Sequence, residues 1–539
     1  MSRRQTEREQ EARRELGHTQ VSPATARFLG VAFLALVFGG SLAQLGLGDL
    51  RAPGRSLVAG IPDACDLRAF ERDFDLGAGL ARRLRPTVQA GLVRLGAGNE
   101  SAYVGLDGWL FHRASVDAAL GGAFLDTSVQ ARRVRSVEAC DPLPQPDPLP
   151  ELTAWHQALA RRGIRLVVLP VPSKVEVHPE RLVGPRAGGA RARNASHARF
   201  LETLRARGVS VFDPYETLQE TARSSGAPAY LATDTHWHPQ AVEAVAEALA
   251  GRIRGELPLG ALGIRFERSQ QQVRRRGDIA ALLDLDGPME TLEIHPVSAP
   301  AGARRPAPVI VLGDSYTNIY SSPEAFADPE GADQTGWGAD AGLAEQLAFH
   351  LGTPVERIAL NDDGAFASRL ELTRRIRAAR RAGREPLAGV SVIVWQFATR
   401  ELSLGNWQAI DLEAAVTASR ESEGSLPGAR RVRASIVDRA PLPAPGGPYP
   451  NALVALRIGE IESLDGRPLP EREGVVYLLA LRDNRALPAV SALGPGDRVE
   501  LRLWNFGEPA VVERYAALRR TELDDPDALL LPAWFGELP

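Results

Sequence analysis

Apolar residues along this chain fall into short continuous runs separated by longer stretches with a helical repeat. The runs predict four buried strands, at Arg165–Val171, Gly208–Asp213, Pro308–Leu312 and Val390–Trp395. Between them, residues 242–253 place apolar side chains three or four positions apart, which predicts a helix with one buried face. Continuous apolar strands that alternate with such helices form mostly parallel sheets covered on both faces. The pattern therefore predicts an α/β fold with a mostly parallel sheet flanked by helices.

The pattern changes after about residue 415. Short runs of β-forming residues then occur at about 431–438, 451–458, 475–482 and 498–504, with turn signals between them. Short strands of this kind predict a small all-β domain over residues 415–539, either a five-stranded barrel or a small sandwich. Two roles stay open for this domain, which are the binding of a glycan or partner and a structural cap on the preceding domain.

The amino-terminal segment joins a basic, polar tail to an apolar run. Residues 1–26 carry five arginines, and the run that follows is interrupted only by Ser41 and Gln44. About 20 apolar residues span a bilayer, and basic residues before the span predict a cytoplasmic amino terminus. We therefore expect a transmembrane signal anchor at residues 27–48 and export of the chain from residue 49 onward. A cleaved signal peptide is the alternative.

Composition narrows the range of functions. The 539 residues are 44% hydrophobic and 24% charged, which is typical of a globular chain with several domains. Because 63 basic residues stand against 67 acidic ones, the charge balance argues against nucleic acid as the main partner. Only two cysteines occur, Cys65 and Cys140, which excludes a disulfide-dense scaffold and a cysteine-rich metal site. In an exported chain these two either form a disulfide or stay unpaired, and their spacing does not decide which.

A serine follows one of the predicted strands directly. The strand Pro308–Leu312 runs into Gly313-Asp-Ser315, and open α/β sheets place their sites at the carboxyl ends of the strands. Because Thr317 stands two residues past the serine, the segment is not the Gly-x-Ser-x-Gly elbow of α/β-hydrolases. The tripeptide alone fits a catalytic nucleophile and also fits an ordinary turn that caps a helix.

A carboxylate and an imidazole stand two residues apart at Asp234 and His236. In an extended segment they point to the same side, so the carboxylate can orient Nδ1 and leave Nε2 to take a proton from a serine. The alternatives are a helix cap with a packed histidine, or His238 as the base, although Pro239 behind His238 suggests a capping role. No convincing third ligand accompanies the two histidines, so no metal site is predicted. Since a serine needs an adjacent base to act as a nucleophile at neutral pH, the Asp-His pair and Ser315 together favour acyl transfer.

Several motifs occur in an order that resembles the SGNH-hydrolase-like alginate O-acetyltransferases, periplasmic proteins that acetylate bacterial exopolysaccharides. The resemblance covers about residues 100–410. Its motifs are Gly105-Leu-Asp-Gly-Trp-Leu-Phe111, Leu169-Pro-Val-Pro-Ser-Lys174, Asp234-Thr-His-Trp237, Arg276-Gly-Asp278, Gly313-Asp-Ser-Tyr316 and Trp395-Gln-Phe-Ala-Thr-Arg-Glu401. As in that family, the Asp-x-His pair precedes the serine. The resemblance implies an SGNH-hydrolase-like catalytic domain over residues 49–414, with Ser315 as nucleophile, His236 as base and Asp234 as orienting acid.

The same resemblance points to an oxyanion hole, which needs donors aimed at the developing negative charge. The backbone N–H of Ser315 is one candidate donor. The segment that begins at Asn361 looks like the block that supplies others, through the Asn361 amide or the Gly364 N–H. Family members often carry an aromatic or more glycine-rich run there.

Two cationic residues lie just past the predicted strands. Arg400 follows Val390–Trp395 and either binds an anionic sugar group or pairs with Glu401. Lys174, the only lysine of the chain, either contacts the acyl donor or the glycan, or pairs with Glu176.

With the export signal, the resemblance predicts a polysaccharide O-acetyltransferase that works through an acetyl-serine intermediate. It implies a single-pass protein of the bacterial inner membrane with its catalytic body in the periplasm. No cofactor is expected, and because acetyl-CoA is cytosolic, the resemblance implies a multi-spanning membrane acyltransferase as acetyl donor, with other exopolysaccharide-assembly proteins as partners. The alternatives are a carbohydrate acetyl esterase with the same triad and a non-catalytic glycan-binding scaffold.

Overall fold

The computed structural model describes most of the chain from residue 79 onward and a short segment before it. The described residues are 22–34, 38–39, 79–136, 144–185, 192–256, 264–285, 289–300, 307–323, 326, 336–361, 364–381, 383–417, 428–443, 451–467, 469, 471–482, 485–505, 511, 515, 518–523, 528 and 531–538.

Some of the sequence predictions fall outside these ranges. Cys65 and Cys140 both do, as do residues 35–37 and 40–48 of the predicted anchor. The helix α2 (Pro23–Leu34) covers the start of that anchor and is 12 residues long. Among the described residues, no helix combines the length and apolar character that crossing a membrane requires. The anchor therefore stays a prediction.

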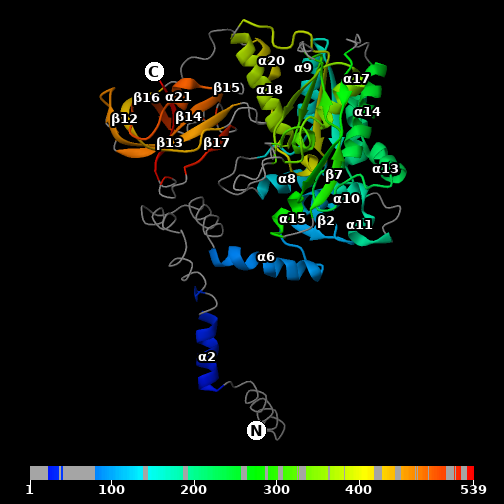
Figure 1. Ribbon diagram of the computed structural model, residues 1–539, viewed down its shortest axis with the longest axis horizontal. Helices are drawn as coiled ribbons and strands as arrows, with labels where there is room; N and C mark the ends of the chain where they lie inside the picture. Colours follow the sequence, from blue (N-terminus) through cyan, green and yellow to red (C-terminus); the bar gives the residue numbers. More distant parts are fainter. Residues whose placement is uncertain are drawn as a thin grey trace, which may run out of the picture. The chain divides into compact units, whose positions relative to one another are not determined.

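Five parallel strands form the central sheet (Figure 1). In sheet order they are β10 (Val355–Ala359), β9 (Val309–Gly313), β11 (Val392–Ala398), β3 (Arg165–Val171) and β4 (Ser210–Val211). Every neighbouring pair runs parallel, which confirms the predicted α/β sheet. The sequence analysis missed β10 because Glu356 and Arg357 stand side by side in it and leave no continuous apolar run, as suits an edge strand. It also predicted a longer β4, which pairs over only two residues.

Successive residues of each strand face opposite layers of helices. Val309 and Val311 of β9 pack into one core with α13 (Tyr215–Ser224), α14 (Pro239–Glu256) and α17 (Leu343–Leu351). Ile310 and Leu312 pack into a second core with three helices on the other face, α9 (Leu149–Ala160), α12 (His197–Ala206) and α18 (Gly364–Arg381). Because both faces are buried, the central strands read as continuous apolar runs in the sequence.

Shorter elements complete this α/β part. Small antiparallel pairs are formed by β1 (Ala102–Val104) with β2 (Leu110–His112), β5 (Glu267–Arg268) with β8 (Val297–Ser298), and β6 (Gln271–Arg275) with β7 (Glu290–Ile294). The remaining helices here are α6 (Gly79–Arg94), α7 (Arg113–Leu120), α8 (Thr127–Arg135), α10 (Lys174–Val177), α11 (Glu180–Val183), α15 (Asp278–Leu282), α16 (Ser315–Asn318), α19 (Glu401–Leu404) and α20 (Leu412–Thr417).

The C-terminal strands close into a ring. The ring order is β13 (Ala452–Ser463), β14 (Glu473–Arg482), β18 (Ala533–Glu537), β16 (Arg498–Asn505) and β12 (Arg430–Arg439), and β12 pairs back with β13. Two short strands, β15 (Arg485–Ala486) and β17 (Arg519–Thr521), and one helix, α21 (Pro488–Ser491), flank it. This closed pairing is that of a small barrel rather than a sandwich. Four of the ring strands correspond to predicted runs, whereas β18 is short and contains a glycine, so it gave no clear signal.

Candidate active site

The Gly-Asp-Ser segment forms a tight turn at the carboxyl end of β9. The strand ends at Gly313, and α16 begins at Ser315, which is 8% exposed to solvent. The carboxylate of Asp314 caps this helix by accepting the N–H of Tyr316 at 2.9 Å. In the described part of the chain, the Ser315 N–H has no hydrogen-bond partner, as expected for the first residue of a helix. The turn therefore presents a serine and an open backbone donor at one place.

Asp314 also fastens this turn to the neighbouring strand β11. Gln396 Nε2 donates to Asp314 Oδ1 at 2.9 Å, and the Ala398 N–H donates to Oδ2 at 3.0 Å. In return, the Asp314 N–H donates to Gln396 Oε1 at 3.0 Å. We call this arrangement the Asp314 clasp. Because Gln396 and Asp314 are both almost fully buried, the clasp fixes the backbone on which Ser315 stands.

The turn leaves no room for a side chain at Gly313. A Cβ there would lie 2.2 Å from Thr317 Oγ1 and 2.9 Å from Gln396 Oε1. Gly313→Ala is therefore expected to destabilise the fold by about 1–3 kcal/mol and to lower the rate of any reaction that depends on Ser315, because the turn must shift. Gly251→Ala is the matched control, since a Cβ in that part of α14 meets nothing within 4 Å and alanine favours a helix. A Gly313→Ala protein with unchanged melting temperature and rate would contradict this account.

Asp234 and His236 form a buried hydrogen-bonded pair. His236 Nδ1 lies 2.7 Å from Asp234 Oδ1, which also accepts the His236 N–H at 2.9 Å. The two residues are 1% and 3% exposed. His236 Nε2 is buried, and no described residue offers it a hydrogen bond. The pair thus leaves the nitrogen opposite the carboxylate available, as a general base requires.

The electrostatics of the pair favour a charged imidazole. Burial alone would lower the pKa of His236, but the charge and hydrogen bond of Asp234, with the charge of Asp278, outweigh it and raise this pKa above its ordinary value. Burial likewise acts to raise the pKa of Asp234, and His236 outweighs it, so that this pKa is lowered. An imidazolium that forms at His236 is therefore stabilised by its surroundings.

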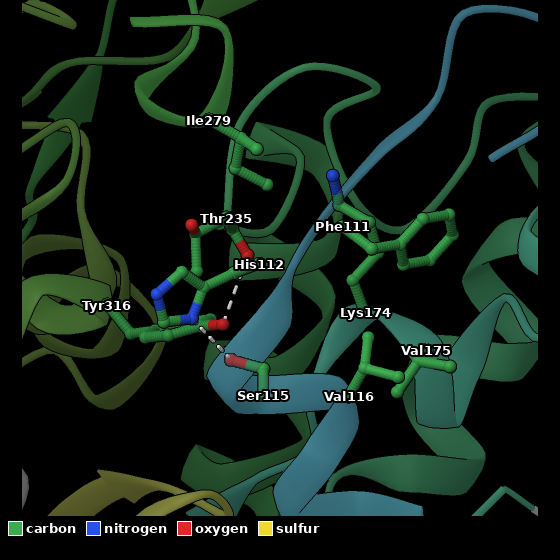
Figure 2. Close-up of a pocket in the computed structure, with 9 residues that line it drawn as sticks. All are labelled: Phe111, His112, Ser115, Val116, Lys174, Val175, Thr235, Ile279 and Tyr316. Carbon is green, nitrogen blue, oxygen red and sulfur yellow. Dashed lines mark hydrogen bonds between the residues drawn. The ribbon is translucent and has the colours of Figure 1, made fainter. Parts of the chain in front are cut away.

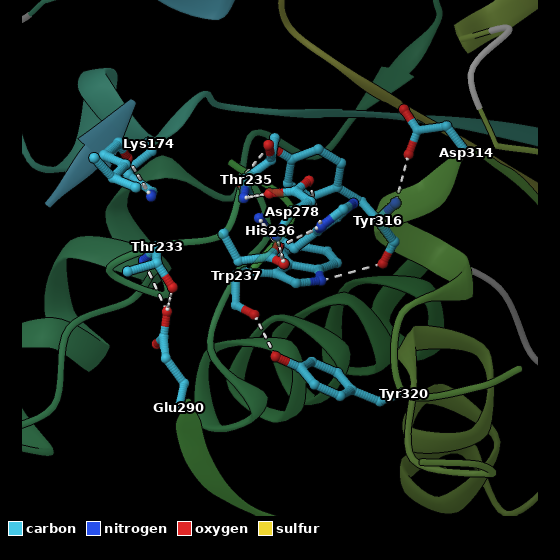
Figure 3. A network of polar contacts seen from close by, with 12 residues as sticks. Lys174, Thr233, Thr235, His236, Trp237, Asp278, Glu290, Asp314, Tyr316 and Tyr320 are labelled. Carbon is cyan, nitrogen blue, oxygen red and sulfur yellow. Dashed lines mark hydrogen bonds and ion pairs between the residues drawn. The ribbon is translucent and has the colours of Figure 1, made fainter. Parts of the chain in front are cut away.

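Three hydrogen bonds bring the Asp-His segment against α16, which we call the serine helix, and against Tyr320 just after it (Figure 3). The Tyr316 hydroxyl donates to the Thr235 carbonyl at 3.0 Å, Trp237 Nε1 donates to the Tyr316 carbonyl at 3.1 Å, and the Tyr320 hydroxyl donates to the Trp237 carbonyl at 2.8 Å. The His236 ring centroid lies 4.8 Å from that of Tyr316, the residue next to Ser315. Two motifs 79 residues apart thus meet in one site, as the sequence predicted. No hydrogen bond joins Ser315 to His236 within the described residues.

A second carboxylate, Asp278, stands beside the pair. Its Oδ2 lies 3.7 Å from His236 Nδ1, and ligand atoms of Asp234, His236 and Asp278 lie within 4.8 Å of one another. These distances would allow the three side chains to bind a metal ion. Backbone N–H groups of His236 and Asp278 already donate to Asp234, however, and that of Thr235 donates to Asp278. The two carboxylates therefore serve as hydrogen-bond acceptors that hold the backbone around His236.

His238 stands directly before α14 and makes hydrogen bonds to its first turn. Its Nδ1 accepts the Gln240 N–H at 3.4 Å, and its carbonyl accepts the N–H of Ala241, at the first turn of α14. Burial lowers the pKa of His238 to about 4. The capping role suggested by Pro239 agrees with these contacts.

Lys174 lies near the site but ties two backbone segments together. Its Nζ donates to the Leu110 carbonyl at 2.7 Å and to the Ala232 carbonyl at 3.2 Å. The alternative of an ion pair with Glu176 is wrong, because Glu176 bonds instead to Arg193 and to the Ser173 N–H. Burial lowers the pKa of Lys174 to about 8 although the nearby carboxylates oppose the change. These contacts make Lys174 a support of the segment that leads to Asp234.

Arg400 follows β11 and has one unsatisfied nitrogen. Its Nε lies 3.6 Å from Glu401 Oε1, a long ion pair, whereas Nη1 is buried with no hydrogen-bond partner among the described residues. Burial acts to lower the pKa of Arg400, but the fields of Tyr316, Glu401 and Asp314 outweigh it and raise the pKa. Arg400 therefore brings a positive charge and a free donor close to the serine helix.

Of the two predicted oxyanion residues, Asn361 contacts the helix that carries Ser315. Asn361 Oδ1 accepts Asn318 Nδ2, from the last residue of α16, at 2.9 Å, and Gly364 is the first residue of α18. Asn318 Nδ2 also donates to the Ala359 carbonyl at 3.1 Å. The structure thus joins Asn361 to the serine helix, and an oxyanion role for it stays a prediction.

A small cavity beside this site is lined by His112, Ser115, Lys174, Thr235 and Tyr316 together with apolar side chains (Figure 2). His112 Nδ1 lies 3.0 Å from Ser115 Oγ. Burial lowers the pKa of His112 to about 4, and the charges of Arg400 and His236 add to the effect. The cavity therefore has a neutral imidazole at its edge.

Sequence reasoning missed three of the residues that build the site. Gln396 and Asp278 stand inside motifs that carried the family resemblance, but no role had been assigned to either. His112 directly follows the Trp-Leu-Phe motif. Their polar side chains next to these motifs were the available signal, and only the fold shows which of them approach Ser315 or His236.

Comparisons with known proteins agree with this geometry. Residues 102–399 match the family described as the SGNH hydrolase-like domain of acetyltransferase AlgX. The probable alginate O-acetylase AlgJ of Pseudomonas aeruginosa is 28% identical over 299 residues, which cover 54% of this chain and 70% of AlgJ. The AlgJ of Azotobacter vinelandii is 25% identical over 310 residues, 52% of this chain and 72% of its own.

A solved structure also aligns with part of this chain, at low identity and a low score. The O-acetyltransferase domain of Pseudomonas putida AlgJ aligns with a TM-score of 0.40 at 19% identity, over 57% of this chain and 93% of that domain. The matched family segment, residues 102–399, is more than half of the chain. It contains β1 to β11 and every residue of the site described above except Arg400 and its ion-pair partner Glu401. The resemblance seen in the sequence is thereby confirmed, and the chain belongs to the SGNH hydrolase-like acetyltransferase family of AlgX.

Proposed function

We propose that this chain transfers acetyl groups to hydroxyls of an exported, alginate-like polysaccharide, with Ser315, His236 and Asp234 as its catalytic residues. The observation that carries the proposal is the unpartnered Nε2 of His236, on a ring that Asp234 orients and that packs against Tyr316 beside the serine. The polysaccharide class is supported by relatives that bear the name alginate O-acetylase.

In the proposed reaction, His236 Nε2 takes the proton of the Ser315 hydroxyl as Oγ attacks the carbonyl carbon of an acetyl donor. The tetrahedral oxyanion is stabilised by the Ser315 N–H and by donors near Asn361 and Gly364. When it collapses, the leaving group takes the proton from His236 and acetyl-Ser315 remains. A sugar hydroxyl then gives its proton to His236 as its oxygen attacks the acetyl carbon. When the bond between Ser315 Oγ and the acetyl carbon breaks, Oγ takes that proton from His236, and the acetylated sugar leaves behind free Ser315 and neutral His236.

Two charged groups of the proposed reaction, the imidazolium of His236 and an anionic group of the acceptor sugar, have partners of opposite charge in the site. Asp234 holds Nδ1 of His236 and stabilises the imidazolium that forms in each half-reaction. Arg400, with its free Nη1, binds an anionic group of the acceptor sugar, such as the carboxylate of a uronic acid. The predicted anchor at residues 27–48 would hold the body at the periplasmic face of the inner membrane, close to a multi-spanning acyltransferase that supplies the acetyl group.

Hydrolysis is the competing reaction, because water is able to replace the sugar hydroxyl at acetyl-Ser315. The test mixes the purified full-length chain with 4-nitrophenyl acetate, alone or with oligouronate or neutral oligosaccharides. Nitrophenol release is read by absorbance and acetylated sugar by mass spectrometry. We expect acetyl on the oligouronate and less on the neutral sugar, because Arg400 lacks an anionic partner there. Nitrophenol without acetylated sugar from any acceptor would favour an esterase, and no release at all would contradict the proposal.

A further inference from the structure

The Arg276-Gly-Asp278 segment lies against the Asp-His pair, although the triad does not use it. A Cβ at Gly277 would lie 2.3 Å from the Thr233 carbonyl oxygen, so only glycine allows this approach. The Asp278 N–H donates to Asp234 Oδ2 at 2.9 Å, and the Thr235 N–H donates to Asp278 Oδ1 at 2.6 Å. The two aspartates are thus linked by a pair of hydrogen bonds that involves the backbone of residues 234–235 and of Asp278.

The second oxygen of Asp278 faces the histidine. Its Oδ2 lies 3.7 Å from His236 Nδ1, the same nitrogen that Asp234 Oδ1 contacts at 2.7 Å. The side chain of Asp278 is 37% exposed, whereas that of Asp234 is 1% exposed. A partly solvated carboxylate therefore stands behind the buried one.

We infer that Asp278 is a positioning residue that works together with Asp234, holding the 233–235 backbone and stabilising the imidazolium form of His236 by its charge. This inference rests on the proposed function, because it takes His236 as the base.

The charged groups around His236 decide whether the loss of Asp278 raises or lowers the pKa of His236. The ring is faced by Asp234, Asp278, Arg400 and His112. Lys174 and Glu290 do not face the ring, but the charge of Lys174 interacts with those of Asp234 and Asp278. Partial burial, with the charge of Asp234 adding to it, raises the pKa of Asp278 to about 6, so this carboxylate is mostly ionised at neutral pH. While it is ionised it raises the pKa of His236, and its removal must let His236 stay neutral down to lower pH.

The test replaces the charge while keeping the shape. Asp278→Asn still offers an oxygen to the Thr235 N–H and retains its own backbone N–H. The rate at which phenylmethylsulfonyl fluoride modifies Ser315, with loss of fluoride, is measured against pH by mass spectrometry, beside the pH profile of acetyl ester cleavage. The acid-side midpoint is expected about one pH unit lower, and the rate at high pH roughly tenfold lower.

Three further variants separate charge from packing. Asp278→Ser, also neutral, is expected to share the shift, and Asp278→Glu is expected to restore the wild-type midpoint. Glu290→Gln is the matched control, because Glu290 Oε1 accepts the Thr233 N–H at 2.7 Å on the same segment without facing His236. It is expected to keep the wild-type midpoint.

The outcomes are distinguishable. An unchanged midpoint and plateau in Asp278→Asn, or the same shift in Glu290→Gln, would overturn the role of Asp278 while Ser315 modification remains. Failure of Ser315 to react in the wild type would overturn the proposed function, and the inference with it.

Discussion

The Ser315→Ala protein is expected to lose acetyl transfer and ester cleavage down to the uncatalysed background, a fall on the order of 10⁶ in kcat if the acetyl group is carried on this oxygen. The variant should fold normally. Alanine is a good helix former at the start of α16, and no described residue hydrogen-bonds to the Ser315 hydroxyl, so no partner is left unsatisfied. Nitrophenol release and acetylated oligosaccharide are measured beside the melting temperature.

Ser224→Ala serves as the control for that substitution. The Ser224 hydroxyl bonds only to the Glu220 carbonyl in its own helix, so its loss should change neither rate nor stability measurably. An active, folded Ser315→Ala protein would show that the acetyl group does not pass through this serine, and the proposed mechanism would then be wrong.

The Asp234→Asn protein is expected to keep its fold and lose roughly 10⁴-fold in rate, the loss seen for this change in a Ser-His-Asp protease. Asp234 accepts N–H groups on both of its oxygens, and an amide has only one oxygen to offer. If that oxygen faces His236, the amide NH₂ meets the Asp278 N–H. If it faces Asp278, the NH₂ favours the wrong tautomer of His236.

The alternative reading of Asp234 as a helix cap is tested by the same experiment. Asp126 is such a cap, because its carboxylate accepts the Ser128 N–H at 2.7 Å at the start of α8, away from the site. Asp126→Asn should therefore leave the rate unchanged. If Asp234→Asn behaves in the same way, with the rate and its pH profile intact, the carboxylate does not act on His236.

The pattern of apolar and polar residues was enough to predict the buried strands and one amphipathic helix of this fold. Continuous apolar runs located β3, β9 and β11, and a helical repeat located α14, because both faces of the sheet are buried there. The order of Asp234, His236 and Ser315 gave the candidate triad. The structure brings the two motifs together, and the catalytic roles of the three residues stay a prediction.

Other features depend on contacts that no local pattern records. β10 is an edge strand with two charged residues among its five, and β18 closes the barrel through pairing with β14 and β16. Lys174 was predicted to reach a ligand or Glu176, but the burial of its ammonium beside two backbone carbonyls follows from the fold. Similarly, Asp278 becomes part of the site only because Gly277 allows two backbones to touch.

The Asp314 clasp makes the serine turn dependent on the completion of folding. Gln396 and Ala398 follow Asp314 by 82 and 84 residues, so the loop between them must close before either bond forms. Contacts of such high sequence separation form late and slowly compared with local turns and helices. A chain emerging from the ribosome or a translocation channel therefore carries Ser315 long before the strand that fixes its backbone. Competence for acyl transfer is in this way tied to a finished sheet, and partly folded chains lack the preformed nucleophile.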